Sequence, residues 1–145
     1  MNREIEYRGF DSREWRYGDL EYNRKNDVAQ IHTYKDDGSY NKQYLVDPYT
    51  VGEFTGMRDK RGKKIFEGDI VRKCDLTFKT ELVGVVVYNS VIGCFRVHSE
   101  QNGTTTRSGF EASDVYNDGK YTVPVKYEYE IIGNVYDNPE LLNKK

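Results

Sequence analysis

The sequence predicts an all-β fold, and three features of its composition support that prediction. β-branched residues dominate the apolar set, with 14 valines and 7 isoleucines against 6 leucines and 2 alanines. Such residues suit a pleated, half-buried surface, whereas helices draw on alanine and leucine. The chain also has 13 glycines and several Asx-Gly pairs, which supply tight turns. No long segment shows the spacing of an amphipathic helix.

The core of this fold is expected to be lean. At 145 residues the chain has the length of one domain. Its hydrophobic fraction is 37%, and exchanging the 13 tyrosines for the 13 glycines leaves that fraction unchanged. When glycine is counted as hydrophobic and tyrosine is not, typical domains have a hydrophobic fraction of roughly 45–50%. We therefore expect tyrosine to supply much of the buried area, with its hydroxyl at a wet edge.

Residues 1–50 are expected to form an N-terminal lobe of short strands. The expected strands are residues 5–10, a short segment around Trp15 and Tyr17, residues 30–34 and residues 40–46. The first alternates apolar and charged side chains, as a half-buried strand does. Residues 11–14 predict the turn that follows it. The last two strands flank Asp36-Asp37-Gly38-Ser39, which predicts a β-hairpin, and Pro48 closes the lobe.

Residues 51–142 are expected to form a barrel-like part with glycine-rich turns. Its expected strands are residues 65–66, 70–71, 82–88, 91–98, 104–106 and 125–132. Gly56, Gly62 and Gly68 lie six residues apart, and we interpret them, together with Asp69, as turn residues. Further turns are predicted at residues 89–90 and 102–103, and short helical turns near residues 111–114 and 139–142.

The charge balance argues against an obligate nucleic-acid-binding protein, whose surface is basic over most of its area. Lysine and arginine number 22 and aspartate and glutamate 24, a net charge of −2, whereas obligate nucleic-acid binders are usually basic. The N-terminus is charged where a signal peptide would be apolar, and the longest apolar run, residues 85–88, is too short to cross a membrane. Two cysteines are too few for a disulfide scaffold. These features predict a cytoplasmic protein without membrane contact.

Three blocks of the sequence stand out at its start, middle and end. They are residues 5–11, which include Arg8-Gly9-Phe10-Asp11, residues 50–71 (TVGEFTGMRDKRGKKIFEGDIV) and residues 129–142 (YEIIGNVYDNPELL). Together they resemble the YopX family of phage and prophage proteins. The second and third blocks are long and specific, and the resemblance spans nearly the whole chain.

The resemblance implies a β-rich barrel or pseudo-barrel of short antiparallel strands, encoded by a phage or prophage and located in the cytoplasm of a bacterial host. We accordingly expect one YopX-like domain over residues 1–142, followed by a tail at residues 143–145. The family brings no catalytic residues to carry over, so the resemblance implies no enzyme class.

The loop at residues 58–64 is a candidate binding site. It carries Arg58, Lys60, Arg61, Lys63 and Lys64 against Asp59, a surplus of four positive charges within seven residues. Such a cluster could contact the phosphates of a nucleic acid. Lysines also keep a loop tip soluble and protect a sheet edge, and we favour that interpretation. The loop does not fit a phosphate-binding P-loop, because five residues separate Gly56 from Gly62 and Lys64 replaces the magnesium-binding Ser or Thr.

Two other groups of residues are weaker candidates for chemistry. Glu67 and Asp69 flank a glycine, which favours a turn over an acid–base pair. Cys74, Cys94 and His98 have a C-x19-C-x3-H spacing that lacks the close cysteine pair of structural zinc sites. Cys94 falls in an expected strand and is predicted to be a small buried hydrophobe. The sequence therefore predicts no catalytic residue, no metal site and no cofactor.

These observations lead to three hypotheses about function. The leading one is a small non-enzymatic accessory protein that binds an as yet unknown protein partner or assembles with itself as a homo-oligomer. The alternative is a nucleic-acid-binding module that uses the loop at residues 58–64. A nuclease or hydrolase is the third hypothesis and the least favoured, because no catalytic constellation is visible.

Overall fold

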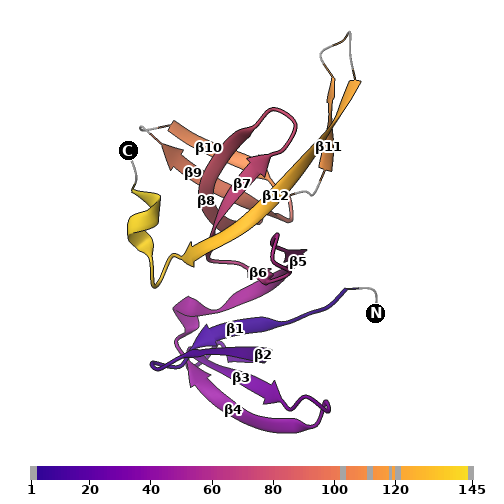
Figure 1. Cartoon of the computed structure of the whole chain (residues 1–145). Coiled ribbons are helices and arrows are strands. Elements are labelled where there is room, and N and C mark those ends of the chain that lie inside the picture. The colour runs from indigo at the N-terminus through magenta and orange to yellow at the C-terminus, as the bar shows by residue number, and fades with distance from the viewer. Residues whose placement is uncertain (1–2, 102–103, 111–112, 118, 120–121, 144–145) are drawn as a thin grey trace. The chain divides into compact units, whose positions relative to one another are not determined.

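The computed structural model describes residues 3–101, 104–110, 113–117, 119 and 122–143 (Figure 1). The fold is all-β, as predicted, and the helical elements of the described part are two short 3-10 turns. No helix among these residues is long and apolar enough to cross a membrane. The chain divides into two compact units, unit 1 at Met1–Met57 and unit 2 at Arg58–Lys145.

Unit 1 is an antiparallel sheet with a 3-10 turn. Its elements are β1 (Tyr7–Phe10), β2 (Trp15–Asn23), β3 (Val28–Tyr34), β4 (Tyr40–Val46), η1 (Pro48–Thr50) and β5 (Gly52–Arg58). The strands lie in the order β4-β3-β2-β1-β5. The predicted hairpin is confirmed as β3 and β4, with Ile31 opposite Tyr44. β2 extends beyond the short strand that the sequence predicted, because it pairs with β3 from Asp19 to Asn23.

The core of unit 1 is small. Ala29, Ile31 and Val46 are 1%, 0% and 7% exposed, and the half-buried side chains of Tyr7, Leu20 and Val51 pack against them. Gly9 lets β1 approach this cluster closely, since a Cβ at that position would lie 2.6 Å from the Cγ2 atom of Val46. A unit with so few buried aliphatic side chains depends strongly on each of them.

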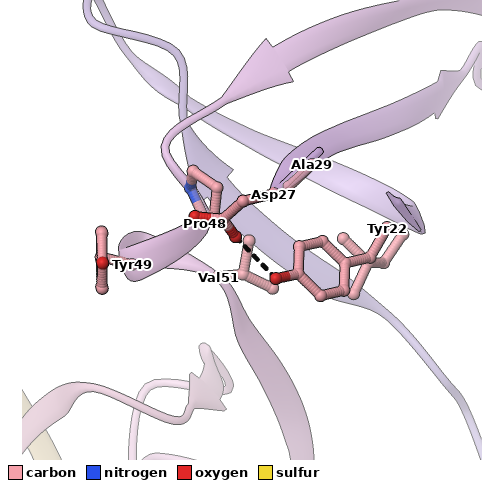
Figure 2. A pocket seen from close by; sticks show the side chains of 7 residues that line it. Tyr22, Asp27, Ala29, Pro48, Tyr49 and Val51 are labelled. Atoms are coloured by element: carbon pink, nitrogen blue, oxygen red, sulfur yellow. Dashed lines mark hydrogen bonds between the residues drawn. The ribbon is translucent and has the colours of Figure 1, made fainter. Parts of the chain in front are cut away.

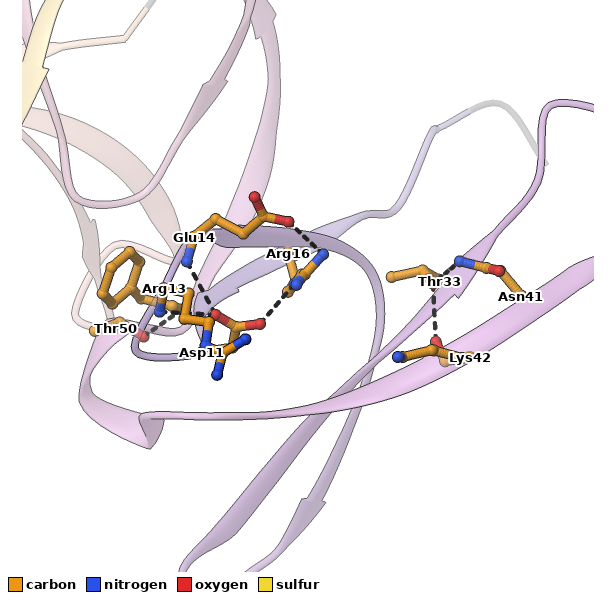
Figure 3. A network of polar contacts seen from close by, with 9 residues as sticks. Asp11, Arg13, Glu14, Arg16, Thr33, Asn41, Lys42 and Thr50 are labelled. Atoms are coloured by element: carbon orange, nitrogen blue, oxygen red, sulfur yellow. Dashed lines mark hydrogen bonds and ion pairs between the residues drawn. The ribbon is translucent and has the colours of Figure 1, made fainter.

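The turn between β1 and β2 is closed by the carboxylate of Asp11 (Figure 3). Its Oδ1 accepts the backbone N–H groups of Arg13 and Glu14, each at 2.9 Å, and its Oδ2 accepts the Nε–H of Arg16 at 2.7 Å. Bonding to the Glu14 amide, then to Arg16 and to the Arg13 amide, lowers the pKa of Asp11 to about 2. The turn predicted at residues 11–14 is therefore confirmed and is built around an ionised aspartate.

We expect the folded protein to show an Asp11 carboxyl that titrates near pH 2, below its ordinary pKa of 3.8. Because the folded pKa is depressed, the contribution of this turn to stability is present above about pH 4 and is lost as the pH falls toward 2. NMR of the side-chain carboxyl carbon measures this titration. Arg16→Gln is expected to raise the pKa, whereas Arg13→Gln, which keeps the bonded amide, leaves it unchanged. A wild-type midpoint near 4 would contradict the structure.

Unit 2 is built around a second antiparallel sheet. Its elements are β6 (Lys64–Phe66), β7 (Asp69–Asp75), β8 (Thr80–Asn89), β9 (Cys94–Gln101), β10 (Thr104–Gly109), β11 (Ser113–Asn117), β12 (Thr122–Asn134) and η2 (Pro139–Leu142). The sheet has the order β10-β9-β8-β7-β12-β11 (Figure 1). Since it runs between two edge strands, the sheet does not close, and a pseudo-barrel describes it better than a barrel.

The buried side chains of unit 2 come mainly from its central strands. Ile70 and Val71 of β7, Val86 of β8 and Val97 of β9 are all 0% exposed. β8 approaches β9 closely at Gly84, where a Cβ would lie 2.5 Å from the carbonyl oxygen of His98. The β-branched side chains of these strands therefore pack into a tight core where the strands approach closely.

The expectation that tyrosine supplies much of the buried area is wrong in large part. Tyr129 is 3% exposed. Seven other tyrosines are at least 41% exposed: Tyr17, Tyr22, Tyr34, Tyr40, Tyr49, Tyr88 and Tyr136. Several hydroxyl groups bond surface carboxylates, as those of Tyr22 and Tyr34 do with Asp27 and Asp19. Tyrosine therefore contributes more to the surface of this protein than to its core.

Two local predictions in unit 2 are wrong. The strand expected at residues 91–98 begins only at Cys94, because Asn89 Oδ1 accepts the N–H groups of Val91 and Ile92, and Gly93 has a φ of 67°. Cys94 follows this wider turn and is exposed, so its prediction as a buried hydrophobe also fails.

The elements near the C-terminus confirm one helical prediction and correct another. The turn expected near residues 139–142 is η2. Residues 113 and 114, expected to be helical, instead begin β11, which pairs with the first half of β12. β12 begins at Thr122 and includes Pro124, so it starts before the strand expected at residues 125–132. Residues 102–103, predicted as a turn, and residues 111–112 lie outside the described residues.

Candidate functional site

The basic loop singled out from the sequence is a tight turn of backbone. The N–H of Asp59 donates to the carbonyl of Lys63 at 2.8 Å, and the N–H of Gly62 donates to the carbonyl of Asp59 at 2.9 Å. Gly56, Gly62 and Gly68 have φ values of 87°, 83° and 92°, in the left-handed region that favours glycine. The three glycines thus occupy the backbone conformation that tight turns require.

Asp59 organises this loop from within. Its side chain is buried, at 7% exposure. Its Oδ1 accepts the N–H groups of Arg61 and Lys63, each at 2.9 Å, and its Oδ2 accepts the N–H of Ile131 in β12 at 3.3 Å. One carboxylate therefore both closes the loop and ties it to β12.

The positive charges of the loop have a carboxylate partner. Glu130 of β12 lies 3.2 Å from Lys60 Nζ, from Arg61 and from Arg72. The hydrogen bond from Lys60 is the main cause that lowers the pKa of Glu130, and the nearby charges of Arg72 and Arg61 act in the same direction. The Lys60 amide also donates to the carbonyl of Tyr129 at 2.8 Å. These contacts favour a structural role for Lys60 and Arg61.

The other three cations of the loop differ from Lys60 and Arg61 in their contacts and exposure. Arg58 donates to the carbonyl of Gly62 at 3.1 Å and so folds back onto its own loop. Lys63 is exposed, and Lys64 is half-buried at the start of β6. The loop therefore does not present its five cations as one convergent set.

The Glu67–Asp69 turn has structural contacts. Asp69 is 2% exposed, and its Oδ2 accepts the N–H of Phe66 at 2.8 Å. The intervening Gly68 donates its N–H to the carbonyl of Val86 at 2.9 Å. The bonded carboxylate of Asp69 closes the turn into β7.

Cys74 lies on β7, whereas Cys94 and His98 both lie on β9. Cys74 is half-buried on β7, and burial raises the pKa of its thiol. Cys94 begins β9, and His98 faces Val85 of β8 in the strand register. Within the described residues, no group of three His, Cys, Asp or Glu side chains is placed to hold a metal ion.

A polar cluster lies across β2, β3 and β4. His32 lies between Glu21, whose Oε2 is 2.7 Å from Nε2, and Tyr40, whose hydroxyl is 3.3 Å from Nδ1. A carboxylate beside an imidazole can orient a general base. Glu21 and Tyr40 are exposed, however, and His32 is half-buried, so these side chains lie along the surface of the sheet. We interpret the cluster as a set of cross-strand contacts that stabilises the sheet.

A concave site in unit 1 that the sequence did not indicate is a pocket of about 500 Å³ (Figure 2). This volume is within the usual range for ligand sites in proteins. Its lining comprises Leu20, Tyr22, Asp27, Ala29, Pro48, Tyr49 and Val51. We call it the tyrosine pocket.

The floor of the tyrosine pocket follows from the register of the sheet. Tyr22 of β2 lies opposite Ala29 of β3, and Leu20 lies opposite Ile31. These residues therefore share the face of the sheet that carries the core. Ala29 is 1% exposed and is one of two alanines in the chain. Its small side chain leaves space that a larger residue would fill.

Tyr49 stands on a backbone that is fixed from both sides. Asp47 caps η1 by accepting the N–H of Tyr49 at 3.0 Å. The Thr50 hydroxyl donates to the Asp47 carbonyl at 2.6 Å and accepts the N–H of Phe10 at 2.8 Å. Although its backbone is held in this way, the Tyr49 side chain is 82% exposed. The ring is thus presented to solvent by a rigid support.

Tyr22 and Asp27 form the polar side of the tyrosine pocket. The Tyr22 hydroxyl donates to Asp27 Oδ1 at 2.6 Å, and this bond raises the pKa of Tyr22 (Figure 2). Asp27 adopts a φ of 53°, a conformation that aspartate tolerates better than most residues. Among the described residues that line the pocket, Asp27 is the one with a charged side chain.

The tyrosine pocket can bind apolar and cationic groups. Leu20, Ala29 and Val51 offer an apolar floor, the two tyrosines offer ring faces, and Asp27 offers a carboxylate. An apolar concave surface that carries a small number of polar groups is typical of recognition sites.

One sequence signal could have located part of this site. Asp47 followed by Pro48 and Thr50 fits the start of a short helical turn, since aspartate is a preferred N-cap and proline suits the first helical position. The sequence interpretation used Pro48 only as the end of the lobe. No local signal indicated that Tyr22 would lie near Pro48 and Tyr49.

The fold and the pocket together define a small all-β protein with two antiparallel sheets and an apolar, tyrosine-lined hollow in its first unit. The model of the family described as YopX protein matches residues 6–143, so the chain belongs to the YopX family, as its sequence blocks indicated. A comparison with curated proteins finds no match.

Proposed function

We propose that the chain is a non-enzymatic accessory protein of a phage or prophage that works in the bacterial cytoplasm by binding another protein. The observation that carries this proposal is the tyrosine pocket, with Tyr22 and Tyr49 exposed at its rim by 46% and 82%. Membership of the YopX family supports the phage origin.

Exposed tyrosines on a rigid support are suited to protein recognition. Tyrosine is enriched among the residues that dominate binding energy, because its ring buries a large area at a small entropic cost. The Tyr49 backbone is already held by Asp47 and Thr50, so binding need not order it. The size of the pocket suits one short segment of a partner.

Peptide selection tests this proposal. A library of random dodecamer peptides is displayed and selected against the wild-type protein, and the enriched peptides are measured by fluorescence polarisation. We expect Tyr49→Ala to weaken their binding at least about tenfold, which corresponds to about 1.4 kcal/mol.

The matched control is Tyr136→Ala, which removes a 41% exposed tyrosine outside the pocket. It should leave peptide affinity unchanged, and circular dichroism checks that both variants are folded. Failure to enrich any peptide, or equal affinity for wild type and Tyr49→Ala, would contradict the proposal.

Self-assembly is the second form of protein binding under this proposal. Light scattering of the wild type and of Tyr49→Ala separates the two forms. An oligomer that becomes a monomer in Tyr49→Ala would make the pocket a contact between copies of the chain. A wild-type monomer leaves a different protein as the partner.

Nucleic-acid binding is the second candidate function, and one observation favours it. Arg72 joins Lys60 and Arg61 beside Glu130, so three cations meet one carboxylate. A phosphate would have to compete with Glu130 for these cations, which is why we rank this function second. Titration with short DNA and RNA at about 50 mM salt decides between the candidates. Binding that is lost when Lys60, Arg61, Lys63 and Lys64 become alanine would favour the nucleic-acid function.

A further inference from the structure

We infer that the tyrosine pocket takes an extended, proline-containing segment that carries an arginine or lysine, presented by a partner protein. This inference rests on the proposed protein-binding function and specifies the chemistry of the ligand. Three observations carry it: the pairing of the strands under the pocket, the rings at its rim and the sign of its charge.

The pocket lies over one face of the sheet. Ala29 of β3, in its floor, pairs with Tyr22 of β2 on one side and with Val46 of β4 on the other, so β3 is an interior strand at this point. A ligand on this floor meets the side chains of that face and no free edge of β3, so it must be recognised through its own side chains. A polyproline II segment suits this requirement, because it has no internal backbone hydrogen bonds and is preformed before binding.

The rim supplies surfaces on which proline rings pack. In Figure 2 the ring of Tyr49 lies on one side and that of Tyr22 on the other, with Pro48 and Val51 between them. Grooves lined by aromatic side chains are the usual partners of proline-rich segments. The exposed rings therefore fit successive turns of an extended ligand better than a single compact ligand.

The charge of the pocket selects a basic residue in the ligand. Asp27 is the charged member of the described lining, and Arg24 and Lys25 of the same turn do not line the pocket. A carboxylate can accept several hydrogen bonds, so its bond with Tyr22 through Oδ1 leaves capacity for a guanidinium or ammonium group. The Tyr22 ring beside it adds a surface for cation–π contact.

The same unit already contains such an arrangement within its own chain. The guanidinium of Arg16 lies 3.7 Å from the centroid of the Tyr44 ring, and its Nε bonds Asp11 Oδ2 at 2.7 Å. Tyr22 and Asp27 offer an incoming arginine the same pair of partners, a tyrosine ring and an aspartate.

Three synthetic peptides test the inference. The first is acetyl-Arg-Pro-Ala-Pro-Pro-Ala-Pro-amide, the second has glutamate in place of arginine, and the third has glycine in place of every proline. Isothermal titration measures their affinity for the full chain and for Asp27→Asn. Asparagine also tolerates the positive φ of this position, so the substitution removes the charge with little strain.

We expect the second and third peptides to bind wild type at least about fivefold more weakly than the first. The affinity of the first peptide for Asp27→Asn should be about fivefold lower than for wild type, whereas the affinity of the second peptide should be unchanged. Tyr49→Ala should lower the affinity of the first peptide by at least about tenfold.

Two kinds of result would overturn the inference, and they are distinguishable. If the selected dodecamers bind in a manner that depends on Tyr49 but lack proline and basic residues, the ligand chemistry is wrong and the proposed function stands. The same holds if the pocket joins two copies of the chain. If no peptide from either experiment depends on Tyr49, both the inference and the proposed function fail.

Discussion

Ile31→Ala is expected to lower the free energy of unfolding of unit 1 by about 3 kcal/mol, within the range found for large-to-small substitutions in protein cores. Ile31 is 0% exposed and belongs to a cluster of three buried aliphatic residues. No other large aliphatic side chain of that cluster is as deeply buried, so little can move in to fill the cavity. Urea titration followed by tryptophan fluorescence measures the loss, since the single tryptophan, Trp15, lies in unit 1.

Two matched variants define the scale of this effect. Ile31→Val removes one methylene group and is expected to cost about 1 kcal/mol. Leu45→Ala removes a side chain of β4 that is 64% exposed, and is expected to change stability by less than about 0.5 kcal/mol. An Ile31→Ala variant no less stable than Leu45→Ala would show that the core of unit 1 is wrongly placed.

Asp59→Ala is expected to destabilise unit 2 by about 3 kcal/mol, because it leaves three backbone N–H groups without their acceptor. These are the amides of Arg61, Lys63 and Ile131. Thermal unfolding followed by circular dichroism measures the loss of stability. Hydrogen exchange by NMR should show that protection falls first at the same three amides.

Two further substitutions separate this effect from a general sensitivity of turns. Asp59→Asn keeps one carbonyl oxygen and is expected to cost less than Asp59→Ala. Asp75→Ala removes a similar turn acceptor, which bonds the N–H groups of Thr77 and Phe78 in an exposed turn, and is expected to cost about 1 kcal/mol. Equal losses for Asp59→Ala and Asp75→Ala would contradict the anchoring role of Asp59.

Most of the strands could be predicted because their signals are local. The hairpin of β3 and β4 follows from alternating residues around an Asx-Gly turn, and the turn at Asp11 from its own short-range bonds. The length of β2 was missed because Gly18 interrupts the alternation and the stretch after it has only two apolar positions, Leu20 and Tyr22; pairing with β3 holds this stretch as a strand. The start of β9 was missed because Asn89 caps a wider turn than a two-residue hairpin.

The tyrosine pocket could not be predicted because it depends on contacts between distant parts of unit 1. Tyr22 and Asp27 come from one hairpin, and Pro48 and Tyr49 from the turn after another. What brings them together is the sheet register and the bonds of Thr50 to β1. The basic loop, by contrast, was visible in the sequence because its residues are consecutive. The sequence could not reveal that Glu130, nearly seventy residues later, would bind two of its cations.

Binding of a protein segment in the tyrosine pocket of unit 1 can be mapped by NMR with the tightest selected dodecamer. Amide shifts of ¹⁵N-labelled protein are followed as the peptide is added. We expect the largest changes at Tyr22, Asp27, Ala29, Tyr49 and Val51. Changes centred instead on the loop at residues 58–64, with those five amides unmoved, would contradict binding in this pocket.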